Sequence, residues 1–90
     1  MKICFLSGFI EIVGQEEIEI DFTGGKVSQL LEALCDRLGN RFRERLMSAE
    51  ADSTRNPLVK ILVNGEDIRQ EDPVLKGEET LFIFLPIAGG

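Results

Sequence analysis

The sequence contains no histidine, tryptophan or tyrosine, and it has only two cysteines among its 90 residues. Without histidine, zinc sites of the mixed cysteine and histidine kind are excluded. Two cysteines are also too few to hold an iron–sulfur cluster. Cys4 and Cys35 lie in apolar or helical surroundings and form no CxxC motif, so we expect buried or half-buried reduced thiols of a cytosolic protein. The sequence therefore predicts neither a bound metal nor a bound cofactor.

Basic residues are also scarce, and long hydrophobic runs are missing. Lys and Arg total 10 against 16 Asp and Glu, which gives a net charge of −6 and a pI of about 4.6. This acidity argues against nucleic acid and suits a partner with a basic groove. The longest apolar stretch, residues 81–88, is far shorter than the ~20 residues that span a bilayer, and the start shows no signal-peptide cleavage site. We therefore expect a cytoplasmic protein without membrane or nucleic-acid partners.

The composition is nevertheless rich enough for one folded domain, with 43% hydrophobic and 29% charged residues. Residues 3–9 are apolar and aromatic, which is typical of a buried strand. In residues 17–22, apolar and acidic side chains alternate strictly, which predicts a strand with one wet face at the edge of a sheet. The short spacing between the two runs predicts an antiparallel hairpin.

A helical period follows this hairpin. Apolar residues recur at helical spacing through residues 26–38, which predicts an amphipathic helix that ends at Gly39. Its start is weakly capped, because Lys26 offers no side-chain acceptor. Residues 41–51 predict a shorter second helix, with Phe42 and Leu46 facing inward. Residues 52–57 are polar and end in proline, so they predict a loop.

The second half of the chain indicates two more strands. Residues 58–63 form the first, and the Asn64-Gly65 pair after it is a strong hairpin-turn signal. Further turns are expected at Asp72-Pro73 and at Lys76-Gly77-Glu78. Residues 81–85 are apolar at every position, as in a central strand covered on both faces. The predicted order β-β-α-(α)-β-β indicates an α+β fold in which one sheet packs on one main helix.

Alternation along the strands predicts which side chains face away from the helix. If Lys60 faces solvent, Ile61 and Val63 enter the core and Leu62 lies on the open face of the sheet. The same argument, with Lys2 outside, places Cys4 and Leu6 on that open face. Residues 81–85 are all apolar, so the sequence alone leaves their orientation undecided.

The last residues, 86–90, predict a thin tail. Pro86 lacks an N–H, so it ends the sheet ladder, and Gly89 and Gly90 carry no Cβ and fit a narrow channel. A terminal carboxylate is ionised at neutral pH and is unreactive as an acyl donor. It becomes reactive only as an adenylate or another mixed anhydride. We therefore expect a rigid strand that leads into a flexible tip, with the carboxylate of Gly90 as the working group.

Three stretches resemble the MoaD/ThiS family of sulfur carriers: Ile61-Leu62-Val63-Asn64-Gly65, Leu75-x-Gly77-Glu78-Glu79 and Phe84-Leu85-Pro86-Ile87-Ala88-Gly89-Gly90. Departures are Gly77-Glu78-Glu79, where the family commonly has Gly-Asp-Glu, and Leu85-Pro86, where it often has Pro-Pro. The resemblance implies a ubiquitin-like β-grasp fold, a mixed sheet packed on one main helix, over residues 1–85, followed by a carrier tail of Pro86, Ile87, Ala88, Gly89 and Gly90. It also implies that Leu81 and Ile83 point inward. The expected partner-binding residues are then Leu6, Leu62, Phe82 and Phe84, beside Cys4.

The family resemblance implies a function without a catalytic side chain in this chain. An activating enzyme that consumes ATP would adenylate Gly90, and a sulfurtransferase would convert it to a thiocarboxylate. The first hypothesis is the small subunit of a molybdopterin synthase, which gives sulfur to a pterin precursor held by a larger synthase subunit in molybdenum cofactor biosynthesis.

Two alternatives stay open. The same carrier chemistry can serve thiazole, cysteine or a tRNA base, or can join the tail to protein lysines. In the second alternative, the chain is a β-grasp module that binds partners non-covalently and never uses its terminus. For the open face, the alternative is that residues 41–51 fold back and cover it.

Overall fold

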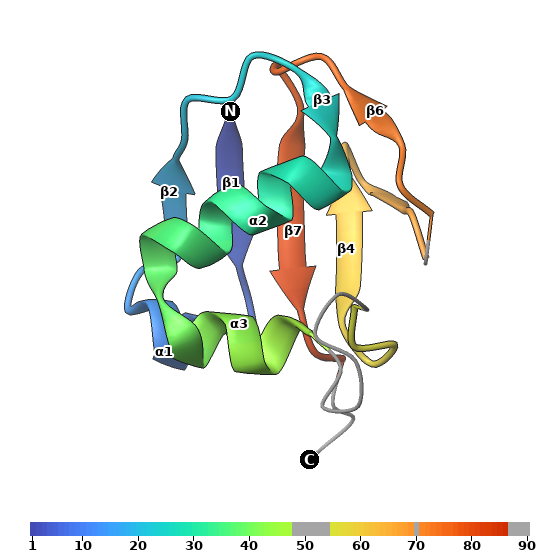
Figure 1. Ribbon diagram of the computed structural model, residues 1–90. Coiled ribbons are helices and arrows are strands. Elements are labelled where there is room, and N and C mark those ends of the chain that lie inside the picture. Colours follow the sequence, from blue (N-terminus) through green and yellow to red (C-terminus); the bar gives the residue numbers. More distant parts are fainter. Residues whose placement is uncertain (48–54, 70, 87–90) are drawn as a thin grey trace.

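The structure is a computed structural model that describes residues 1–47, 55–69 and 71–86. Within these ranges the chain forms seven strands and three helices (Figure 1). In chain order they are β1 (Lys2–Phe5), α1 (Ile10–Val13), β2 (Glu17–Glu19), β3 (Gly25–Lys26), α2 (Val27–Leu38), α3 (Asn40–Leu46), β4 (Lys60–Val63), β5 (Glu66–Asp67), β6 (Val74–Leu75) and β7 (Thr80–Phe84).

The main sheet is mixed and has β7 at its centre. Its strand order is β2-β1-β7-β4-β5, and β3 and β6 form a separate pair. The contact between β1 and β7 is parallel, whereas the other pairs are antiparallel. Helix α2 lies across one face of this sheet (Figure 1). The predicted α+β, β-grasp arrangement is therefore confirmed, and so are the β1–β2 hairpin and the edge position of β2.

Helix α2 forms where the apolar period predicted it. Its inner side buries Leu30, Leu31 and Leu34 in the core. The weak start is strengthened from a distant loop, because Asp72 accepts hydrogen bonds from the Ser28 N–H and hydroxyl, both at 2.7 Å. A carboxylate at this end of a helix is favourable, because it meets unpaired N–H groups and the positive end of the helix dipole.

Helix α3 packs Phe42 into the core on the same side of the sheet as α2. The Phe42 ring meets the rings of Phe5 and Phe9 edge-on, with centroids 5.9 and 5.5 Å apart. Phe42 and Leu46 are fully buried, as predicted. The helix is shorter than predicted, because Met47 is extended and forms a bridge with Arg55. Residues 48–51 of the predicted helix lie outside the described residues.

The first predicted strand, residues 3–9, was too long. Strand β1 ends at Phe5, and the chain turns because the Leu6 carbonyl accepts hydrogen bonds from the N–H groups of Phe9 and Ile10. The short helix α1 that follows was not predicted. The second strand is also shorter than residues 17–22, since only β2 pairs with β1. The last strand agrees within one residue at each end.

The predicted turns at Asn64-Gly65 and at Lys76-Gly77-Glu78 are both confirmed. Asn64 and Gly65 have φ values of 51° and 88°, which suits the tight hairpin between β4 and β5. Before β7, the Glu79 carboxylate accepts hydrogen bonds from the N–H groups of Lys76, Gly77 and Glu78. These bonds, the one from Lys76 foremost, hold the pKa of Glu79 below its usual range.

Candidate functional site

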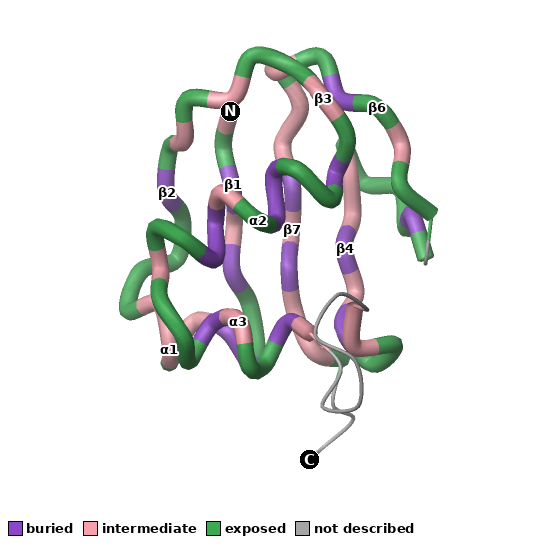
Figure 2. Tube along the Cα trace, viewed as in Figure 1, coloured by how far each residue is buried: buried purple, intermediate pink, exposed green. Residues whose placement is uncertain are grey.

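The face of the sheet opposite α2 carries the side chains that the sequence assigned to partner binding. Along β7, Leu81 and Ile83 are 0% exposed, whereas Phe82 and Phe84 are half-buried (Figure 2). The inward orientation of Leu81 and Ile83 is therefore confirmed. The expectation that β7 is covered on both faces is wrong, because only the α2 side of the sheet is fully buried.

The strand register gathers the predicted residues into one apolar surface. Phe82 of β7 is paired with Cys4 of β1 on one side and with Leu62 of β4 on the other. Leu6 follows β1, is 44% exposed, and donates its N–H to the Ile83 carbonyl at 3.1 Å. We call these residues and Phe84 the open-face patch: Cys4, Leu6, Leu62, Phe82 and Phe84. Their role in partner binding stays a prediction.

Charged side chains border the open-face patch at both edges of the sheet. Lys2 lies 3.6 Å from Glu17, and Lys60 lies 3.1 Å from Asp67. The Arg69 N–H, and then the Lys60 ammonium, hold the pKa of Asp67 below its usual range. An apolar centre with a charged rim is the usual anatomy of a protein interface.

The second predicted helix does not cover the open-face patch over the part that the structure describes. Its Phe42 contacts Phe5 and Phe9, which belong to the core on the α2 side of the sheet. The remaining residues, 48–51, lie outside the described residues. An apolar surface that the described part of the second helix leaves uncovered fits a partner site.

The base of the tail adjoins the open-face patch. Leu85 follows β7 and donates its N–H to the Ser7 carbonyl at 2.8 Å, and Pro86 after it is exposed. Pro86 has no N–H to continue the ladder, so the sheet ends here, as predicted. The other predicted tail residues lie outside the described residues, and their role stays a prediction: Ile87, Ala88, Gly89 and Gly90.

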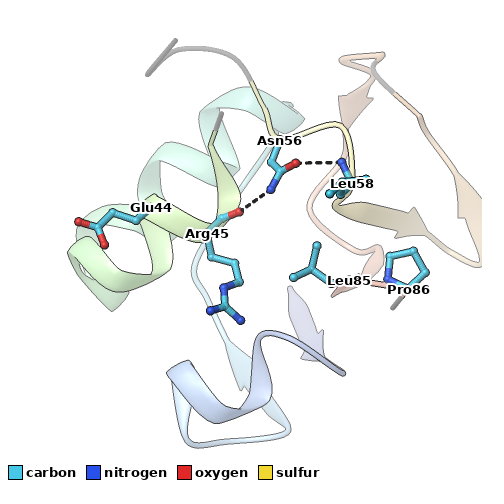
Figure 3. Close-up of a pocket in the computed structure, with 6 residues that line it drawn as sticks. All are labelled: Glu44, Arg45, Asn56, Leu58, Leu85 and Pro86. Carbon is cyan, nitrogen blue, oxygen red and sulfur yellow. Dashed lines mark hydrogen bonds between the residues drawn. The ribbon is translucent and has the colours of Figure 1, made fainter. Parts of the chain in front are cut away.

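A pocket of about 460 Å³ opens beside the base of the tail (Figure 3). The sequence did not indicate it. Leu58, which lines it, is 69% exposed although it was assigned to a strand. Gly8 does not line the pocket, but it was the one local signal for close packing near the base of the tail, because a glycine inside an apolar run often marks a close approach of the backbone. The sequence interpretation missed this signal. The lining residues are Glu44, Arg45, Asn56, Leu58, Leu85 and Pro86.

Neither cysteine is well placed for nucleophilic chemistry. Both thiols are free, Cys35 buried and Cys4 half-buried, which agrees with the expectation. Burial raises the pKa of each thiol, so the reactive thiolate is less populated at neutral pH.

Among the described residues, no three acidic or cysteine side chains gather as metal ligands do. Within the same residues, no helix has the length and apolar character needed to cross a membrane.

Comparison with known proteins gives both a family and a fold. The ThiS family model matches residues 4–90. The solution structure of small archaeal modifier protein 1 from Methanosarcina acetivorans superposes with a TM-score of 0.81 at 22% identity, over 99% of this chain and 94% of that chain. The crystal structure of SAMP1 from Haloferax volcanii gives a TM-score of 0.77 at 22% identity, over 99% and 97% of the two chains.

A third solved structure, the HVO 2177 protein of Haloferax volcanii, is similar at a TM-score of 0.72 and 26% identity, over 99% of this chain and 84% of that chain. No curated protein matches the sequence significantly. The structural likenesses show the ubiquitin-like β-grasp fold.

Proposed function

Because the chain belongs to the ThiS family, we propose that it is a sulfur carrier whose working group is the carboxylate of Gly90. The observation that carries the proposal is the junction of β7 with the tail. The central strand of the sheet leads straight into Pro86, and the open-face patch lies on that same strand. A partner that docks on the patch thus receives the tail from a rigid support.

In the proposed chemistry, two steps load the tail with sulfur. A carboxylate oxygen of Gly90 attacks the α-phosphate of ATP, which forms an acyl adenylate and releases pyrophosphate. A hydrosulfide, or its equivalent from a sulfurtransferase, then attacks the acyl carbon and expels AMP, leaving a thiocarboxylate and a proton. The thiocarboxylate sulfur then attacks the acceptor and expels a leaving group from it, which forms a thioester. Hydrolysis of the acyl–sulfur bond leaves the sulfur on the acceptor and restores the carboxylate.

The acid–base groups for these steps are assigned to partner enzymes, an adenylating activating enzyme and a sulfurtransferase. The chain has no histidine, and burial disfavours the thiolate forms of Cys4 and Cys35. A persulfide carried on a cysteine is therefore the weaker way to hold sulfur. This chain supplies the acyl group and the docking surface, and it acts as a non-catalytic carrier.

For the acceptor, we propose the pterin precursor of molybdopterin. The sequence has no phosphate-binding glycine loop and no histidine, so the pterin pocket belongs to a larger synthase subunit that receives the tail. The second candidate is attachment to protein lysines, where the lysine amine attacks the activated acyl carbon and forms an amide. It is favoured by the similarity to proteins described as small archaeal modifier proteins.

The sulfur-carrier proposal predicts a thiocarboxylate that does not depend on cysteine. The protein is incubated with its activating enzyme, ATP and a sulfide donor, and its intact mass is measured. We expect the mass change for one oxygen replaced by sulfur, located at Gly90 by fragmentation. A double variant, Cys4→Ala and Cys35→Ala, should gain the same mass, because neither thiol is the proposed carrier. A gain of one whole sulfur atom without loss of oxygen, which disappears in the double variant, would favour the persulfide route instead.

The choice of acceptor has its own test. We expect thiocarboxylated protein, mixed with a synthase large subunit and sulfur-free precursor, to yield molybdopterin detected as its fluorescent oxidation product. Absence of molybdopterin, together with conjugates that carry Gly90 in an amide bond to lysine, would replace the first acceptor by the second.

A further inference from the structure

The hydrogen-bond ladder between β1 and β7 is interrupted where the tail begins. A regular parallel ladder would pair the Leu85 N–H with the Leu6 carbonyl, since the Leu6 N–H already bonds to the Ile83 carbonyl. That carbonyl is occupied instead by the N–H groups of Phe9 and Ile10 in the turn before α1. The Leu85 N–H bonds to the Ser7 carbonyl at 2.8 Å. The last main-chain hydrogen bond after β7 is therefore accepted by the turn at residues 6–8 instead of by the regular ladder position.

Gly8 provides the space into which Leu85 packs. Gly8 is buried and has a φ of +90°, a conformation that other residues rarely adopt. A Cβ built on Gly8 would lie 2.8 Å from both Cβ and Cδ1 of Leu85. A methyl group at this position would therefore displace the Leu85 side chain.

Arg45 of α3 fixes the same turn from the other side. Its Nη1 donates a hydrogen bond to the Gly8 carbonyl at 2.8 Å. Arg45 is itself tied to the loop before β4, because Asn56 donates to the Arg45 carbonyl at 3.4 Å and accepts from the Leu58 N–H at 2.9 Å (Figure 3). Helix α3, the turn and the tail base thus form one connected unit.

We propose that Arg45 and Gly8 are positioning residues for the tail: they form a socket that fixes Leu85 and sets the point from which the tail leaves the domain. The inference rests on the proposed function of Gly90. The five residues after Leu85 can span roughly 17 Å when extended, so the base of the tail decides where Gly90 arrives relative to the open-face patch. If the base of the tail is displaced, a partner still docks on the open-face patch. The carboxylate of Gly90 is then held in the wrong place for reaction.

The first test compares variants of two glycines that both have a positive φ. Gly8→Ala meets Leu85, whereas Gly14→Ala, at a φ of +80°, meets nothing within 4 Å. We expect Gly8→Ala to lower the kcat of adenylation by the activating enzyme about tenfold, because reaction depends on alignment of the carboxylate, and to leave KM near the wild-type value. Gly14→Ala should leave both constants unchanged. Equal kcat values for the two variants would overturn the inference.

The second test removes the hydrogen bond without touching a glycine. Arg45→Met should lower kcat and speed hydrogen exchange of the Leu85 amide, whereas Arg41→Met, an exposed residue of the same helix, should do neither. Arg45→Lys, which keeps a donor, should restore part of the kcat. A wild-type kcat and unchanged Leu85 exchange in Arg45→Met would refute the socket.

The two proposals fail in different ways. If the wild-type protein is not adenylated by its activating enzyme at all, the proposed function fails. If the wild type is adenylated and the Gly8→Ala and Arg45→Met variants are adenylated just as fast, only the socket fails.

Discussion

A chain that lacks Gly90, or that carries one extra residue after it, is expected to lose adenylation by the activating enzyme while its folded domain stays intact. The reacting carboxylate would be withdrawn from the α-phosphate of ATP by one residue, or replaced by a peptide bond that cannot attack. Because alignment of reacting groups accounts for a large part of such rates, we expect a loss of more than about 10³-fold. Pyrophosphate exchange measures the rate.

The control for this experiment is an extension of one residue at the other end, before Met1. It changes the length equally and leaves the tail untouched, so its exchange rate should equal that of the wild type. Thermal unfolding of the two C-terminal variants should agree with that of the wild type, because both keep every side chain of the core that the structure describes. Normal adenylation of the C-terminally extended protein would contradict the sulfur-carrier proposal.

Phe84→Asp is expected to weaken binding to the activating enzyme and to the synthase subunit. A buried interface aromatic typically contributes ~2 kcal/mol or more, which corresponds to roughly a 30-fold rise in Kd. The aspartate would place a charge on the open-face patch, at the position of β7 that is paired with Lys60 of β4. The free energy of unfolding should change less, because Phe84 is only half-buried in the isolated chain. Titration calorimetry and chemical denaturation measure the two quantities.

Val74→Asp is the matched control for this variant. Val74 is 71% exposed on β6, which belongs to the separate β3–β6 pair, so the substitution adds the same charge to another apolar surface residue. We expect its Kd to stay near the wild-type value. A large loss of stability in Phe84→Asp with unchanged binding would show that Phe84 serves packing within the domain and has no part in docking.

The elements that the sequence determined are those with a local signal. The helical period of residues 26–38 and the Asn64-Gly65 turn are properties of neighbouring residues, and both were predicted correctly. The alternation between charged and apolar residues also placed Cys4 and Leu62 on the open face, because side chains of a strand alternate between its two faces. The terminal glycines were recognised for the same reason, as a short motif.

Tertiary structure decided what has no local signal. The orientation of β7 could not be derived from an all-apolar run, and only its packing between β1 and β4 fixes Phe82 on the open face. The start of α2 is capped by Asp72, which is 44 residues away from Ser28 in the sequence. The end of β1 at Phe5 likewise depends on the conformation of the turn at residues 6–8, which the apolar run concealed.

The socket at the base of the tail shows the same division most clearly. Arg45, Gly8 and Leu85 come from three distant parts of the chain, and only Gly8, a glycine inside an apolar run, carries a local signal. Their contacts exist only because α3 and β7 both meet the turn after β1. Sequence periodicity reports how one element presents its faces, whereas a contact between elements depends on how those faces pack together in three dimensions.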